Sequence, residues 1–224
     1  MASYKLTIAR IQGCPAPAKL AELLEKYGLP EGDEFGVLNY SATSETVFGT
    51  VIRRVQQAVQ KLDAEAKEVT AAPVEKVVLY PFGVKPSTGR LEIYAGSAAA
   101  IEQLGAFLAS SLGLSTVVEP LEVDIPSALN NLMKNVQKFQ LRALRVSDYA
   151  HNSYMTGTYG PKFLDSQHGQ EFLEEYAEQV VSASVKFQAQ KGRANATLTP
   201  NACFAFSCNE DDQPVVQSIL RKLV

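Results

Sequence analysis

The sequence contains no tryptophan and only three cysteines and two histidines among its 224 residues. Because an odd and sparse set of cysteines is not a disulfide framework, we expect a reducing compartment. No run of about 18 consecutive apolar residues occurs, which argues against a membrane-spanning helix. The first residues also lack the apolar core of a signal peptide. We therefore expect a soluble cytoplasmic protein that makes no membrane contact.

Signatures of catalysis are equally scarce. The candidate metal ligands are His151, His168, Cys203 and Cys208, but an offset of five residues puts the two cysteines on opposite faces of a strand. The nearest match to a phosphate loop ends in Arg90, where such a loop requires lysine. We therefore predict no metal site, no cofactor and no catalytic residue. An enzyme whose site is unrecognised stays as an alternative.

Positive charge is not in excess overall, since the chain has 21 basic and 24 acidic residues and a net charge of −3. The charges are segregated, however. Two basic segments, 134–162 and 180–208, flank an acidic one at 165–179, and such segregation creates local fields that the net charge hides. The alternative is that runs of this size arise by chance on exposed faces. The basic residues are Lys134, Lys138, Arg142, Arg145, Lys162, Lys186, Lys191 and Arg193.

Tyrosines recur at intervals of five residues in the stretch 145–163, at Tyr149, Tyr154 and Tyr159. Their interleaving with Arg145, His151 and Lys162 suits a surface that follows a nucleic-acid backbone and stacks on bases. Tyrosine is also favoured in protein interfaces. A third interpretation is an ordinary strand-and-loop region whose tyrosines cover the edge of the core.

Hydrophobic periodicity predicts the elements of secondary structure. Strands are expected at 4–11, 34–42, 74–80 and 89–96, and a meander of three strands occupies 180–208. Helices are expected at 18–28, 98–113, from Asp124 or Ser127 to about 135, at 165–179 and at the end of the chain. Residues 136–146 fit either a helix or a strand, and we favour the strand. Only the helix would align Lys134, Lys138, Arg142 and Arg145 as one basic ridge.

The segment 52–69 has apolar residues at alternating intervals of three and four. This spacing predicts a long amphipathic helix with a heptad pattern over residues 50–70. Such a helix lies on a sheet or pairs with another subunit. In the second case the interface residues would be Ile52, Val55, Val59 and Leu62.

Together these elements predict an α+β fold, with a mainly antiparallel sheet and helices packed on one side. We expect two lobes built from β-β-α units. The first lobe covers residues 1–125 and contains the long helix. The second covers 126–224 and contains the meander.

The order of the segments "VEKVVLYPFGVKPSTGRLEIYAG", "DIPSALNNLM", "FQLRALRVSD" and "DSQHGQEFLEEYAEQ" resembles the bacterial recombination-associated protein RdgC family. The likeness is one of pattern over perhaps 170 residues and contains no diagnostic short motif. RdgC chains are longer, and no functional residue can be transferred by motif. The resemblance implies a ring-forming dimer that holds double-stranded DNA in a positively charged hole with little sequence preference.

The leading hypothesis is therefore a non-catalytic, sequence-nonspecific DNA-binding protein. It would act as a homo-oligomer in DNA recombination, maintenance or defence. The phosphate contacts would come from the eight basic residues, with the three tyrosines and His151 beside them. The alternative is a protein-interaction subunit of a larger complex, assembled through the 50–70 segment and the tyrosine stretch.

Overall fold

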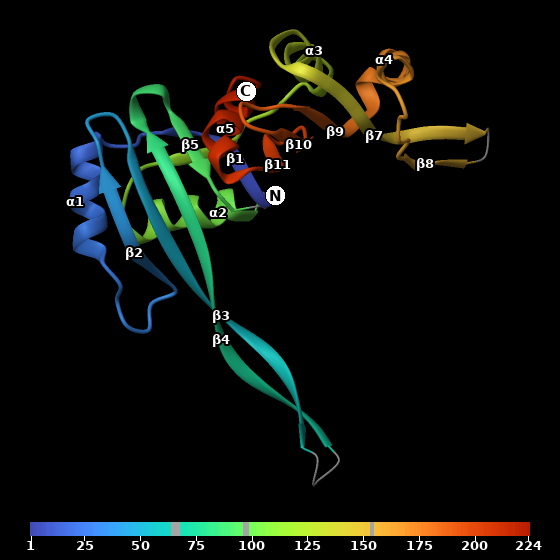
Figure 1. Ribbon diagram of the computed structural model, residues 1–224. Helices are drawn as coiled ribbons and strands as arrows, with labels where there is room; N and C mark the ends of the chain where they lie inside the picture. The colour runs from blue at the N-terminus through green and yellow to red at the C-terminus, as the bar shows by residue number, and fades with distance from the viewer. Residues whose placement is uncertain (64–67, 96–98, 153–154) are drawn as a thin grey trace. The chain divides into compact units, whose positions relative to one another are not determined.

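The computed structural model describes residues 1–63, 68–95, 99–152 and 155–224 of the chain (Figure 1). The fold is α+β with mainly antiparallel strands, as predicted. The chain divides into two compact units. The N-terminal unit contains Ile11–Ala95 and Ala99–Val118, and the C-terminal unit contains Met1–Arg10 and Glu119–Val224. The predicted boundary at 125/126 thus differs from the observed one, and the first ten residues belong with the second half of the chain.

The N-terminal unit contains four strands in the order β2 (Phe35–Ala42), β3 (Val47–Asp63), β4 (Glu68–Lys85) and β5 (Arg90–Ile93). Its helices are α1 (Pro17–Tyr27) and α2 (Ala99–Ala106), and a π-helical turn at Phe107–Ser111 follows α2. The buried ring of Phe107 lies 5.3 Å from that of Tyr27 and 5.8 Å from that of Phe35. These contacts join the helices to the sheet.

The described residues of the segment 50–70 belong to strands β3 and β4, so the predicted long helix is wrong. β3 and β4 pair without interruption from Val47 opposite Val84 to Asp63 opposite Glu68. β2 and β5 pair only with the first part of this hairpin, which continues beyond them as a two-stranded ribbon (Figure 1). Both faces of such a ribbon are exposed, so its apolar residues need not alternate, and their spacing mimics a helix.

The four residues predicted as a helical interface consequently have different environments. Ile52 is buried, Val55 is half-buried and Val59 is exposed. The side chain of Leu62 lies outside the described residues. The described residues of this segment form no helical stripe that could pair with another subunit. The abundance of valine in both strands agrees with the ribbon.

The C-terminal unit contains the strand order β1-β11-β10-β9-β7-β8. The bounds are β1 (Ala2–Gln12), β11 (Cys203–Cys208), β10 (Arg193–Leu198), β9 (Val180–Gln188), β7 (Gln137–Asn152) and β8 (Met155–Tyr159). The meander is confirmed. Residues 136–146 belong mainly to strand β7, so the basic helical ridge does not form. A short strand, β6 (Val117–Pro120), crosses the boundary between the units.

Three helices pack on the apolar face of this second group of strands. They are α3 (Ile125–Asn135), α4 (Ser166–Glu175) and α5 (Gln213–Arg221). α3 contacts β7 and β9, α4 contacts β7, and α5 contacts β11. Asp124 and Asp165 cap α3 and α4 by accepting hydrogen bonds from the backbone N–H groups of Ser127 and His168. The prediction of helices on one side is confirmed for this unit.

Candidate nucleic-acid interface

The other face of the C-terminal unit's strands carries polar side chains in register. Residues directly opposite each other in antiparallel strands point to the same face. The pairings align β1, β11, β10, β9 and β7 in cross-strand rows. One row is Ser3, Ser207, Asn195, Lys186 and Gln140. A second is Lys5, Ala205, Thr197, Ser184 and Ala143. Two shorter rows are Arg193 with Gln188, and Arg145 with Ser182. All of these residues are exposed or half-buried, and we call them the polar face.

Basic residues are the only charged residues in these rows. They are Lys5, Arg145, Lys186 and Arg193, and no carboxylate shares the rows with them. Two further lysines, Lys138 and Lys162, line hollows on the same face. Within the described part of the chain, no acidic side chain forms an ion pair with any of the six. The face therefore has a positive charge that the protein itself does not neutralise.

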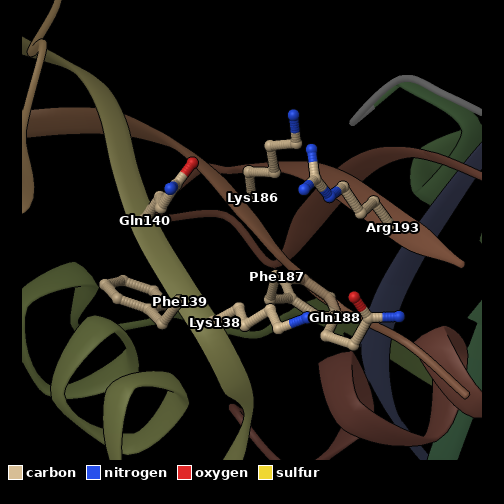
Figure 2. Close-up of a pocket in the computed structure, with 7 residues that line it drawn as sticks. All are labelled: Lys138, Phe139, Gln140, Lys186, Phe187, Gln188 and Arg193. Carbon is tan, nitrogen blue, oxygen red and sulfur yellow. The ribbon is translucent and has the colours of Figure 1, made fainter.

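The first hollow lies over β7, β9 and β10, and Figure 2 shows its lining. The amine of Lys186 and the guanidinium of Arg193 point to the same side of the strands, and Lys138 extends toward Gln188 (Figure 2). The other lining residues are Phe139, Gln140 and Phe187. Three cations and the amide of Gln140 offer hydrogen-bond donors around a small space, which is the chemistry that holds a phosphate group. The amide of Gln188 already donates to the carbonyls of Ala189 and Gly192.

Lys138 has a backbone φ of 51°, in the left-handed region that residues with a side chain rarely adopt. It lies where the register between β7 and β9 shifts, between Gln137 and Gln140. A left-handed residue of this kind costs about 1–2 kcal/mol. Lys138 lines the hollow together with Gln140, at a point where this irregularity interrupts the regular ladder between β7 and β9.

The second hollow lies farther along β7 and β9, where β8 begins to contribute. It is lined by Ala143, Leu144, Arg145, Thr158, Gly160, Lys162, Ser182 and Ser184. Lys186 and Ser182 are four residues apart on β9, which corresponds to about 13 Å along the strand. The two hollows therefore form one track with cations at both ends, and its length matches about four base pairs of duplex DNA at about 3.4 Å each.

The tyrosines of the stretch 145–163 do not belong to this track. Tyr159 pairs with the buried Val146, so its side chain points to the helix-covered face. Its ring stacks on Tyr149 at 4.7 Å, and Tyr149 lies 5.4 Å from Tyr176, which follows α4. Hydrogen bonding to Glu175, together with burial, raises the pKa of Tyr176 to about 12. Tyr149 and Tyr159 therefore cover the edge of the core and lie away from the track, and base stacking by them stays a prediction.

Several predicted residues lie outside the track or outside the described residues. Lys134 ends α3 on the helix-covered side, and Arg142 lies at a register shift and lines neither hollow. Lys191 lies in the β9–β10 turn with its Nζ 2.8 Å from Asp211, which neutralises it. The backbone of His151 belongs to β7, but its side chain is outside the described residues, as is all of Tyr154.

Five of the eight predicted basic residues thus converge on the polar face: Lys138, Arg145, Lys162, Lys186 and Arg193. The sequence reasoning missed Lys5, Gln140 and Gln188. The alternation in the first strand indicates that Lys5 is exposed, but only its pairing with β11 brings it to this face. Gln140 and Gln188 are uncharged, and no motif marks them.

The described residues offer little for catalysis. They contain no group of three or more histidine, cysteine or acidic side chains arranged to hold a metal ion. Cys203 is half-buried on the polar face and Cys208 is buried on the opposite one, as their spacing predicted. Burial raises the pKa of the Cys208 thiol, and it raises that of Cys14 to about 11. Neither thiol has the lowered pKa of a cysteine nucleophile.

His168 lies on the exposed first turn of α4, away from both hollows. Its Nδ1 is 2.8 Å from Asp165, whose hydrogen bond and charge raise the pKa of His168 above its usual value. A raised pKa means that the imidazolium stabilises the folded state at low pH. That contribution is lost as the pH rises from about 6.5 through the folded-state pKa.

We expect Asp165→Asn to lower the pKa of His168, because the amide keeps the helix cap and removes the charge. An NMR titration of the His168 ring in both proteins measures the change, with the ring of His151 as the internal reference. An unchanged His168 pKa would show that the pair does not form in solution.

Comparison with known proteins does not identify a family. No protein-family model matches the chain, and no curated protein is significantly similar to it. The resemblance to the RdgC family stays a prediction. No helix in the described ranges is long and apolar enough to cross a membrane.

Proposed function

We propose that the chain is a cytoplasmic, non-catalytic, sequence-nonspecific DNA-binding protein that contacts phosphates through its polar face. The observation that supports this proposal best is the composition of that face. It carries six basic residues and no acidic one, in a chain whose net charge is −3. Chance placement of charge on an exposed surface mixes the two signs, whereas phosphate binding requires one sign.

The composition also favours a particular mode of binding. The cross-strand rows of the polar face contain no aromatic side chain. Of the two phenylalanines that line its first hollow, Phe139 is half-buried and Phe187 is buried, so neither is an exposed platform on which bases can stack. Lysine, arginine, serine and amide side chains remain, and these groups contact the sugar–phosphate backbone without reading the base sequence. This supports duplex DNA as the ligand more than unstacked single strands.

Fluorescence anisotropy with a labelled DNA duplex, measured over a series of salt concentrations, tests the proposal. If four to six cations contact phosphates, the logarithm of the binding constant should fall against the logarithm of salt concentration with a slope of about −4 to −5. Duplexes of unrelated sequence should bind equally, and single-stranded DNA and duplex RNA serve as comparison ligands. Absence of binding to any duplex at low salt would refute the proposal.

The resemblance to RdgC supports a role in DNA recombination, maintenance or defence as part of this proposal. A second candidate function is that of an assembly subunit, and one observation favours it. The β3–β4 ribbon exposes valines in both strands beyond the point where β2 and β5 end, and exposed apolar side chains of this kind mark protein contacts.

A further inference from the structure

The β3–β4 ribbon has two edges that differ in chemistry. In a strand, the backbone N–H and C=O groups of alternate residues point to the same side. The N–H of Arg54 donates to the carbonyl of Glu34, so the even-numbered residues of β3 point away from β4. The carbonyl of Pro81 accepts from the N–H of Tyr94, so the odd-numbered residues of β4 point away from β3.

Proline closes the outer edge of β4. Pro73 and Pro81 are both odd-numbered, so the N–H that each lacks would have pointed outward. Pro81 lies near the part covered by β5, but Pro73 lies in the distal ribbon and interrupts the donor row there. A proline on an edge strand prevents another strand from pairing with it.

The outer edge of β3 is open. β2 pairs with β3 no farther than Arg53, and among the described strands only β4 pairs with the residues beyond. The backbone groups of Gln56, Ala58 and Gln60 therefore point outward without a strand partner, and all three residues are exposed. No proline or carboxylate occurs in the segment 55–61, and its only charged residue is Lys61 at the distal end.

We infer that this open edge pairs with the same edge of a second copy of the chain, antiparallel and centred on Ala58. In that register Ala58 faces its own equivalent, and Gln56 faces the partner's Gln60. The two glutamine amides can donate to and accept from each other. This pairing uses residues 55–61 of the free part of β3, which continues to Asp63. It stops before Arg54, whose N–H is already bonded.

Because the outer edge of β4 is blocked, only one further copy of the chain pairs with each ribbon. Within the two ribbons, pairing of the β3 edges about a twofold axis uses both open edges. It leaves the two β4 edges of the ribbons, which Pro73 interrupts. The result is a closed dimer and cannot extend into a fibre. A second unblocked edge would allow indefinite growth.

The dimer also gives the ribbon the neighbours that it lacks alone. A two-stranded ribbon is marginally stable in water, whereas three or more strands support one another. Val59 of β3 is 40% exposed. Pairing of the two β3 edges makes a four-stranded sheet with the β3 strands at its centre, so Val59 gains cross-strand contacts. This inference does not depend on DNA binding.

A pair of proline variants tests the interface. Ala58→Pro removes one outward N–H of β3 and leaves the β3–β4 hydrogen bonds intact. Glu75→Pro is the matched control, because residue 75 also points outward but lies on the edge that Pro73 already closes. Light scattering over a dilution series should show a mass of twice 24.3 kDa for the unmodified chain and for Glu75→Pro, and a monomer for Ala58→Pro. A dimer that persists in Ala58→Pro, with circular dichroism like that of the unmodified chain, would overturn the inference.

A cysteine pair provides a second measurement that does not depend on proline. Two residues that face each other in a hydrogen-bonded antiparallel pair have their Cα atoms about 5.5 Å apart, within the range of a disulfide. Ala58→Cys should therefore form a covalent dimer under mild oxidation. The amount of covalent dimer formed by Glu75→Cys should not exceed the background formed through Cys14 and Cys203. Equal cross-linking of the two variants would refute the Ala58-centred pairing.

Discussion

Replacement of Lys186 and Arg193 by glutamate should abolish measurable DNA binding at moderate salt. Both side chains line the first hollow and point to the same side of the strands (Figure 2). Each lost phosphate contact reduces the salt slope by about 1. At about 0.1 M salt, the loss of two such contacts corresponds to a decrease in affinity of about 60-fold, and the two introduced carboxylates repel the phosphates further.

A matched variant separates this local effect from the change in net charge. Lys134→Glu together with Lys222→Glu changes the net charge by the same amount, but Lys134 ends α3 and Lys222 follows α5, on the helix-covered side. We expect this control to bind DNA with nearly unchanged affinity at physiological salt, because the Debye length there is only about 8 Å. Anisotropy titrations of both variants at the same salt concentration make the comparison. Equal weakening by the two variants would contradict a phosphate track on the polar face.

Local signals predicted much of the C-terminal unit. The alternation of Ala183, Ser184, Val185 and Lys186 separates core from solvent in β9, and the caps Asp124 and Asp165 begin α3 and α4 as their side chains indicate. The faces of β9 and β10 could be assigned before the structure was known. That is why Lys186 and Arg193 could be expected to point outward together.

Pairing between distant segments could not be predicted in the same way. The register of Lys5 opposite Ala205 brings the start of the chain to the polar face, and no periodicity within β1 reveals its neighbour. The irregularities of β7 are also invisible in the sequence, although they decide the position of Lys138 and leave Arg142 outside both hollows.

The expected helix at 50–70 and the expected placement of the tyrosines beside the basic residues fail for a common physical reason. A spacing of three and four residues indicates a helix only when one face is buried, and the distal ribbon has no buried face. Tyrosines near basic residues indicate base stacking only when they share a face with them. Tyr159 shares a face with the buried Val146, which the register of β8 against β7 determines.

Phe187→Ala should have the largest effect on stability of the substitutions considered. Phe187 is 1% exposed and lies opposite Ala194 in the apolar face of β9 and β10. Its truncation leaves a cavity beneath the polar face and should lower the free energy of unfolding by about 3–5 kcal/mol. Urea unfolding followed by circular dichroism measures the loss, and hydrogen exchange of the β9 amides assigns it to the C-terminal unit.

The neighbouring residue provides the control, because Lys186 lies on the same strand with its side chain on the other face. Lys186→Ala should change the stability by no more than about 0.5 kcal/mol, yet it should weaken DNA binding by about eightfold at about 0.1 M salt. The expected pattern is a loss of stability in Phe187→Ala only, together with weaker DNA binding by Lys186→Ala. This pattern would show that one face of β9 is structural and the other binds DNA. If Phe187→Ala changed the stability by less than about 1 kcal/mol, the alternation assigned to β9 would be incorrect.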